Sequence, residues 1–245
     1  MGYSTKFTGK IAVRPRLNEH EIAYLRRFAD SRHMDRDKGP YCCGADWDDD
    51  ESDVLDYNEP GPDQPGLWCN WEPTDDGRYI RWNKAEKFYD SAKWMAYLIR
   101  TFLMPGAALQ DELADPVRDF YYAPEFEHFT FDHACDGALK ALGDSPDDRW
   151  SLIVADGEVF VQHKGKDERE GPITDTSATE LAFIPVVLAG GPHDGEVHEA
   201  WAPYVRKGLR LSDGTRYALD PAAPPGSDMT ERGRIMHFQE VEAVM

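Results

Sequence analysis

The sequence predicts an α+β fold, in which β-hairpins pack on two main helices and a smaller, mostly β unit follows. Residues 66–82 and 150–162 indicate the hairpins, because short aromatic or β-branched runs flank turn residues there. Residues 18–30 and 86–103 indicate the helices, because apolar side chains recur at helical spacing. Both periodicities in one chain favour a mixed architecture.

Local signals define the first elements. Residues 4–14 alternate in polarity, which predicts a strand. Its buried face would carry Phe7, Gly9, Ile11 and Val13. In the next helix, Asn18 is placed to act as the N-cap and Glu21 as the second half of a capping box. Residues 31–66 are polar and rich in Asp, Gly and Pro, and we expect a long surface loop there.

The central part of the chain carries the first hairpin and the second helix. In the hairpin, alternation places Leu67, Cys69 and Trp71 on one face and Trp68 on the other. The helix over residues 86–103 would bury one apolar face, formed by Phe88, Ala92, Met95, Leu98, Ile99 and Phe102.

A strand over residues 127–133 and a short helix over 134–142 are expected next. The second hairpin would turn at Asp156 and Gly157. We therefore expect a first domain of residues 1–165.

The rest of the chain is expected to form a linker and a second unit. Residues 166–178 lie in a charged stretch that is poor in apolar groups, which predicts a linker. Residues 179–245 would form a small β-rich domain. A unit of this size is marginal alone, so we expect it to pack on the first domain or on another subunit.

The charge of the chain limits its partners. The formal net charge is −19, from 46 acidic and 27 basic side chains. Residues 1–40 carry nine basic and five acidic groups, whereas residues 41–80 carry one basic and twelve acidic groups. A nucleic-acid partner and an anionic membrane surface are both disfavoured, because each requires clustered Lys and Arg.

The compartment is expected to be the cytoplasm. The N-terminal MGYSTKFTGK has no apolar segment of the secretory kind, and the longest apolar run, residues 182–189, is too short to cross a bilayer. Four cysteines in a chain of this length do not form a secreted disulfide framework.

Four segments carry a resemblance. They are MGYSTKFTG, NEHEIAYLRRFADSRHMDRD, VLDYNEPGPDQPGLWCNWEPTDDG and RWNKAEKFYDSAKWMAYLIRTFL. Together they resemble a family of small uncharacterised cytosolic proteins of bacteria and phages, although Lys84 and Ala85 replace the glycine pair usual in that family. Separately, VVLAGGPHDGE resembles a segment of small actinobacterial and actinophage proteins. The resemblance implies a bacterial or host cytoplasm and no catalytic mechanism.

An acidic run, ADWDDDESDVLD, is the first candidate for binding. Its aspartates, which include Asp46, Asp48, Asp49 and Asp50, begin like a calcium loop, but Glu51 and Tyr57 stand where an EF-hand needs Gly and Glu. Three alternatives stay open. The run is a solvated loop, a divalent-ion site, or a surface that presents carboxylates to a basic protein in place of DNA phosphates.

Catalytic motifs are incomplete throughout. His20 with Glu21 and His198 with Glu199 each begin a zinc-protease motif that lacks its second histidine, and the cysteines form no CxxC pair. His128 and Asp132 would share one face of the expected strand, either as an acid/base pair or as hydrogen-bonded neighbours. The segment GGPHDG is expected to be a hairpin turn because no convincing helix follows it. We therefore expect no bound metal or cofactor.

An aromatic cluster is the second candidate for binding. It comprises Trp68, Trp71, Trp82, Tyr89 and Trp94, with Arg81, Glu86 and Lys87 close in sequence. Most of these rings are expected in the core, but one face of the hairpin could present Trp to a partner.

These observations predict a non-enzymatic accessory protein of a bacterium or phage that binds another protein, such as a host factor, through an acidic and aromatic surface. The alternative is a protein that binds or modifies a nucleotide-like small molecule in an aromatic-lined pocket, with Arg81 beside the ring. The binding residues expected for these functions are Asp46, Asp48, Asp49, Asp50, Trp68, Trp71, Arg81, Trp82, Glu86 and Lys87. The oligomeric state is left open.

Overall fold

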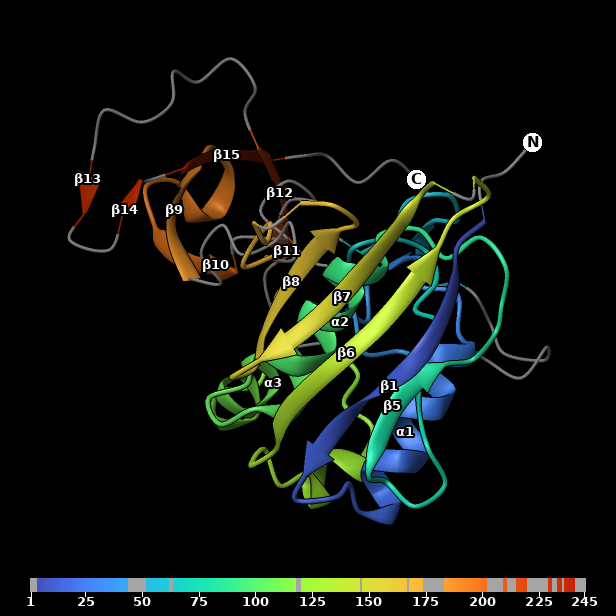
Figure 1. Ribbon diagram of the computed structural model, residues 1–245. Helices are drawn as coiled ribbons and strands as arrows, with labels where there is room; N and C mark the ends of the chain where they lie inside the picture. The colour runs from blue at the N-terminus through green and yellow to red at the C-terminus, as the bar shows by residue number, and fades with distance from the viewer. Residues whose placement is uncertain are drawn as a thin grey trace. The chain divides into compact units, whose positions relative to one another are not determined.

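The computed structural model divides the chain into two compact units, Met1–Thr176 and Ser177–Met245 (Figure 1). The structure describes residues 4–43, 52–61, 64–117, 120–145, 147–166 and 168–173 of the first unit. In the second unit it describes residues 183–201, 209–210, 215–219, 229–230, 233–234 and 236–240. In the described ranges, no helix is both long and apolar enough to cross a membrane.

The first unit is built on a six-stranded antiparallel sheet in the order β4-β5-β1-β6-β7-β8. The strands are β1 (Lys6–Arg14), β4 (Trp71–Pro73), β5 (Tyr79–Trp82), β6 (Ala134–Leu142), β7 (Arg149–Ala155) and β8 (Glu158–His163). Along β1, Phe7, Ile11 and Val13 are buried while Lys6, Thr8 and Lys10 are exposed. This alternation gives the sheet one core face and one solvent face.

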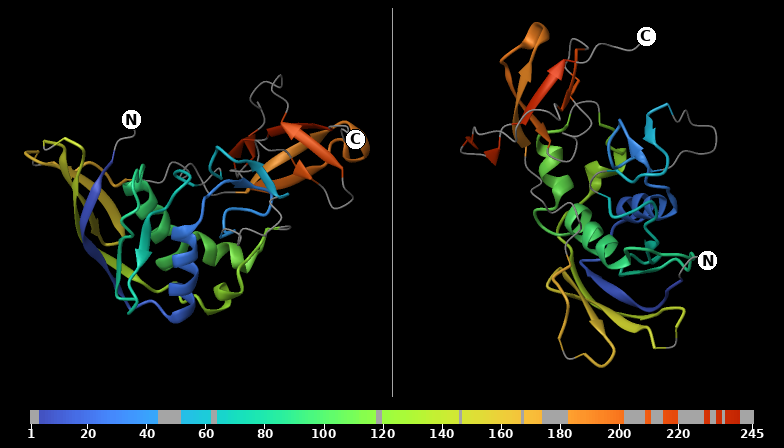
Figure 2. Two further views of the ribbon diagram at one scale, coloured as in Figure 1. Left: turned by 90° about the vertical axis from the view of Figure 1, so that its right-hand side faces the viewer. Right: turned by 90° about the horizontal axis from the view of Figure 1, so that it is seen from above.

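The helices cover only the core face of this sheet. Figure 2 shows α1 (Glu19–Asp30), α2 (Ser91–Leu98) and α3 (Ala108–Ala114) on the same side of it. The core between the two layers is rich in aromatic rings. For example, the ring of Tyr24 lies 4.5 Å from that of Phe126, and the ring of Phe28 lies 5.2 Å from that of Phe102. The first unit is therefore an α+β sandwich with one open sheet face.

Both predicted helices form, but the second begins later than expected. The capping box at the start of α1 is confirmed, because the Asn18 side chain accepts from the Glu21 backbone and the Glu21 side chain accepts from the Asn18 backbone. Helix α2 begins at Ser91 because Asp90 has a φ of 51°, which no helical residue adopts. It continues as a π-helical turn, Ile99–Leu103. The predicted face is buried except for Ala92, which is partly buried, and Trp94 and Tyr97 are buried as well.

Two predicted elements after α3 are wrong. Residues 127–133 form no strand: a short 3-10 helix, Pro124–His128, is followed by irregular chain. Residues 134–142 are strand β6 and not a helix. All nine residues of β6 pair with β1, from Ala134 with Arg14 to Leu142 with Lys6, and this long-range pairing outweighs the helix propensity of the alanines and leucines.

The prediction of a surface loop over residues 31–66 is also wrong for much of the segment. Its chain forms two short paired strands, β2 (Asp35–Arg36) and β3 (Val54–Asp56). Several of its side chains are buried, including His33, Met34, Tyr41 and Gln64. Part of this segment is therefore core.

The second unit is mostly β and is described by itself. Its main sheet has the order β10-β9-β15-β12-β11, in which β15 runs parallel to β9 and the other pairs are antiparallel. A separate pair joins β13 to β14. The strands are β9 (Phe183–Ala189), β10 (Val197–Trp201), β11 (Leu209–Arg210), β12 (Arg216–Leu219), β13 (Met229–Thr230), β14 (Gly233–Arg234) and β15 (Met236–Glu240).

Candidate functional site

The aromatic cluster divides into core rings and surface rings. Trp71 and Trp94 are fully buried. The Trp71 ring packs edge-on against Phe7 and Phe88, each 4.9 Å away, and its Nε1 donates to the backbone oxygen of Ser91 at 2.8 Å. Trp71, which we expected among the binding residues, is therefore a core residue and cannot meet a partner at the surface.

Trp82 and Arg81 are already engaged within the first unit. The half-buried ring of Trp82 lies 5.9 Å from Phe7, and its Nε1 donates to the Ala85 backbone oxygen at 3.1 Å. The Arg81 guanidinium donates to Glu72 at 2.9 Å across the β4–β5 pair. The Arg81 cation is therefore already paired, and the Trp82 ring is held by an edge contact and a hydrogen bond.

Trp68 differs from these residues because its side chain is 47% exposed. The predicted alternation holds only in part: Cys69 and Trp71 are buried and Trp68 is exposed, but Asn70 is buried too, because the strand begins only at Trp71. The backbone of Trp68 forms a β-bridge with Arg32, and the amide of His33 donates to the carbonyl of Leu67 at 2.9 Å. Trp68 is thus fixed to the stretch of chain that follows α1.

The chain that follows α1 also pairs with a second segment that carries exposed apolar side chains. Strand β3, which pairs with β2, contains Leu55, and this residue is 49% exposed. Tyr57, which directly follows β3, is 48% exposed. The amide of Asp35 donates to the carbonyl of Glu59 at 2.9 Å, which fixes the chain beyond β3. We name the group of Leu55, Asp56, Tyr57, Glu59 and Trp68 the 55–68 surface.

The charge of the 55–68 surface comes from two carboxylates. Asp56 and Glu59 are exposed, and no ion pair to either is found in the described part of the chain. Four other carboxylates of the acidic stretch form ion pairs with arginine: Asp53 with Arg36, Glu72 with Arg81, Asp75 with Arg26 and Asp76 with Arg78.

The aspartates of the acidic run, Asp46, Asp48, Asp49 and Asp50, lie outside the described residues.

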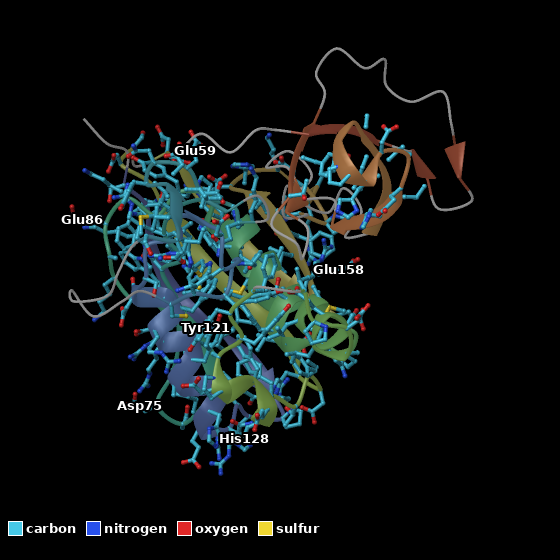
Figure 3. The ribbon with its side chains drawn as sticks, turned by 180° about the vertical axis from the view of Figure 1, so that it is seen from behind. Glu59, Asp75, Glu86, Tyr121, His128 and Glu158 are labelled. Atoms are coloured by element: carbon cyan, nitrogen blue, oxygen red, sulfur yellow. The ribbon has the colours of Figure 1, made fainter. Side chains whose placement is uncertain are left out.

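The remaining expected binding residues lie in other parts of the first unit. Glu86 and Lys87 are exposed in the segment between β5 and α2. Figure 3 shows Glu59 and Glu86 toward one end of the first unit, and Asp75 and His128 toward the opposite end. Glu59 and Asp75, both in the acidic stretch, therefore do not lie on one surface.

The expected pair of His128 and Asp132 does not form. Instead, the ring of His128 stacks on that of His20 with centroids 3.9 Å apart. The neighbouring His133 pairs with Glu21 in the interior, with Nε2 and Oε1 3.0 Å apart. Sequence reasoning assigned Glu21 only to the capping box and missed this pair, because the two residues are 112 positions apart.

The cysteines offer no activated nucleophile. All four are free thiols. Burial raises the pKa of Cys42 to about 11 and the pKa of Cys43 to about 12, and it also raises the pKa values of Cys69 and Cys135. In the described ranges, no group of three His, Cys, Asp or Glu side chains could hold a metal ion.

The GGPHDG segment forms a turn, as predicted. It contains a three-residue 3-10 helix, Gly191–His193, and leads into strand β10. The Glu196 carboxylate lies 2.9 Å from Nε2 of His198 and 3.2 Å from Nδ1 of His193. These hydrogen bonds from the two histidines lower the pKa of Glu196.

The comparisons with known proteins found no match to this chain. No protein-family model matches the sequence. No curated protein matches it, and no solved structure matches its fold. The candidate site therefore rests on the geometry of the 55–68 surface.

Proposed function

We propose that this chain is a non-enzymatic accessory protein of a bacterium or phage that binds another protein in the cytoplasm. The contact would be made by the 55–68 surface, which combines exposed apolar side chains with two exposed carboxylates. Aromatic anchors supply much of the binding energy at protein interfaces, and complementary charge at the rim guides association. This combination favours a partner with a basic rim around an apolar pocket.

The exposure of Trp68 is the observation that carries this proposal. Burying a large aromatic ring is a major source of stability, and in this chain Trp71 and Trp94 are completely buried. Trp68 leaves nearly half of its surface in water, although the backbone on both sides of it is fixed. A rigid, exposed tryptophan has little conformational entropy to lose on binding, which suits an interface anchor.

The alternative function, binding of a nucleotide-like molecule, has less support. It requires a stacking ring with a cation beside it. Trp82 is packed against the core and Arg81 is paired with Glu72, so this pair of residues does not supply the two groups. Trp68 is the most exposed tryptophan of the cluster in the described chain, and Arg32, whose backbone bridges it, is the one arginine that this alternative could use beside it.

The test compares Trp68→Ala with Tyr121→Ala. Tyr121, labelled in Figure 3, is a matched control because it is an aromatic residue that is 45% exposed and is not part of the 55–68 surface. Immobilised wild-type chain and each variant are used to capture proteins from bacterial lysate at low salt, and the bound proteins are quantified by mass spectrometry. We expect the wild type and Tyr121→Ala to retain the same partner, Trp68→Ala to lose most of it, and high salt to weaken it.

Retention of the partner by Trp68→Ala, or recovery of no salt-sensitive partner by the wild type, would overturn the proposal. Thermal unfolding of both variants checks that the fold is kept. A parallel thermal-shift screen of the wild type against nucleotides tests the alternative, which predicts a rise in melting temperature.

A further inference from the structure

The solvent face of the six-stranded sheet has a charge opposite to that of the whole chain. Strand β1 contains three basic residues and no acidic residue, β7 contains one basic residue and no acidic residue, and β6 contains Lys140 and Asp136. These three strands carry five basic groups and one acidic group, and the other three strands of the sheet add Arg81, Glu72 and Glu158, whereas the whole chain has 27 basic and 46 acidic groups. An excess of cations on one face of an acidic protein is a distinct electrostatic feature.

Three lysines of β1 and β6 form a triangle on this face, toward the end where β1 begins. Lys6 and Lys10 lie on the same side of β1, and β6 pairs with it so that Lys140 is opposite Thr8, midway between them. Diagonal neighbours on adjacent strands are roughly 7–8 Å apart, so Lys140 is about equally far from both. All three side chains are exposed. We name Lys6, Lys10 and Lys140 the lysine triangle.

The lysine triangle has no carboxylate partner among the described residues. None of the ion pairs found there involves Lys6, Lys10 or Lys140, whereas Arg14 at the end of β1 is paired with Asp136. The residues facing Lys140 across the sheet are Thr8 and Ser151, which are uncharged. Next to the triangle, Leu142 is 41% exposed, which adds an apolar contact to the cationic surface.

We propose that the lysine triangle docks an extended acidic segment of a protein partner. Alternate side chains of an extended chain point the same way and are roughly 6.6 Å apart, which is half of the roughly 13 Å between Lys6 and Lys10 along β1, and Lys140 lies level with the midpoint, opposite Thr8. A segment with acidic residues at every second position can therefore place successive carboxylates over Lys6, Lys140 and Lys10. This surface is separate from the 55–68 surface, so the protein would contact two partners, or two parts of one partner, through surfaces of opposite charge.

The surroundings of the triangle favour an acidic polypeptide over nucleic acid. Proteins that bind single strands stack bases on open aromatic rings. On this face, the ring of Tyr79 is already covered by the Lys10 ammonium, 3.3 Å from its centroid. Asp136 and Glu158 lie in the next row of the sheet, so they limit the length of any anionic chain that this area can accept. A short acidic segment fits within the cationic area.

The test uses a fluorescently labelled peptide with four aspartates alternating with serines as the probe. Its anisotropy is measured against the full chain, against Lys140→Glu and against Lys38→Glu at low and high salt. Lys38→Glu is the control, because Lys38 is exposed, lies outside the sheet and gives the same change in net charge. We expect Lys140→Glu to weaken binding at least tenfold, Lys38→Glu to change it less than twofold, and high salt to abolish it.

The proposal is overturned if the wild-type chain does not bind the peptide at low salt, if both variants weaken binding equally, or if a single-stranded oligonucleotide of equal charge displaces the peptide and binds more tightly. Circular dichroism checks that Lys140→Glu folds, and Lys10→Glu, on the neighbouring strand, provides a second variant with the same expected loss. Trp68→Ala should leave peptide binding unchanged. Failure of the lysine triangle is therefore distinguishable from failure of the proposed function.

Discussion

His133 and Glu21 form an ion pair in the interior, with Nε2 and Oε1 3.0 Å apart and exposed fractions of 1% and 0%. The other ring nitrogen of His133, Nδ1, lies 2.8 Å from the backbone oxygen of Pro15. Both nitrogens therefore face acceptors, which favours the doubly protonated, cationic ring. Glu21 also accepts from the amides of Thr130 and Asn18, so the pair connects the start of α1 to the chain before β6.

The first prediction concerns pH. Burial alone would raise the pKa of Glu21, but the hydrogen bonds from His133, Thr130 and Asn18 outweigh it and hold the pKa below its ordinary value of 4.5. Burial alone would lower the pKa of His133, but the hydrogen bond to Glu21 and its charge raise it above 6.5. The contribution of His133 to the free energy of unfolding is therefore complete below pH 6.5 and is lost as the pH rises through the raised pKa of His133 in the folded state. The glutamate contribution is complete above pH 4.5 and is lost as pH falls through its lowered pKa.

The pair should therefore stabilise the fold most between pH 4.5 and 6.5. Breaking it by Glu21→Gln should lower the free energy of unfolding by about 3 kcal/mol in that range, because a buried charge loses its partner. Urea unfolding between pH 4 and 9 measures the difference, which should shrink at both ends. Glu19→Gln is the control, since Glu19 is exposed in the same helical turn. A difference that stays constant across this range contradicts the ionic pair.

The second prediction separates a buried ion pair from an exposed one. Arg36 Nη1 and Asp53 Oδ1 are 2.7 Å apart, and both side chains are at most 9% exposed. Asp53→Asn should lower the free energy of unfolding by about 3 kcal/mol, because the guanidinium stays buried without its counter-charge. Glu72→Gln removes the partner of Arg81, which is half exposed, and should cost less than about 1 kcal/mol. Equal losses in urea unfolding would show that Arg36 remains solvated.

The third prediction concerns the close approach of β1 and β6. Gly9 has a φ of 109°, and a Cβ atom there would lie 2.8 Å from the backbone oxygen of Ala138. Gly9→Ala should therefore lower the free energy of unfolding by about 2 kcal/mol or more, because it adds a clash with backbone to the conformational strain. At Gly106, φ is also positive but the space is open, so Gly106→Ala should cost only about 1 kcal/mol. Thermal unfolding of both variants measures the difference in stability. Equal losses would show that the clash with the Ala138 backbone adds nothing to the strain of an alanine at positive φ.

The parts of the fold that the sequence predicts correctly depend on neighbours in the chain. The capping box needs only Asn18 and Glu21, and the turn of the second hairpin needs only Asp156 and Gly157, which both have positive φ. The opposite burial of Trp68 and Cys69 agrees with the expected alternation, which fails at the next residue, Asn70, where no strand has begun. Each of these features is determined within a few residues, where sequence patterns are informative.

The parts that the sequence does not predict depend on distant partners. Strand β6 has a helix-like composition, and only its pairing with β1 makes it a strand. Arg36 and Asp53 lie in a polar stretch typical of a loop, yet they are buried because each neutralises the other. The lysine triangle combines strands more than 120 residues apart in sequence, so no local pattern could indicate it. Net charge alone hid this surface, because it averages over both faces of the sheet.

The last prediction concerns the thiols. Cys42 and Cys43 are partly exposed, but burial raises their pKa values to about 11 and about 12, from an ordinary value of 9.0. The thiolate is the reactive form, so at pH 8 Cys42 should react with iodoacetamide roughly a hundredfold more slowly than a free cysteine, and Cys43 more slowly still. The rate should rise about tenfold per pH unit up to pH 10, since the thiolate fraction grows by that factor. Mass spectrometry of the native chain follows the labelling of each site. Cys69 and Cys135 are buried, so they should be labelled only after unfolding in urea and provide the internal control.

Rapid labelling of Cys42 at pH 7 would contradict the raised pKa. It would identify an activated thiol next to Lys38, whose backbone oxygen lies 3.8 Å from the Cys42 sulfur.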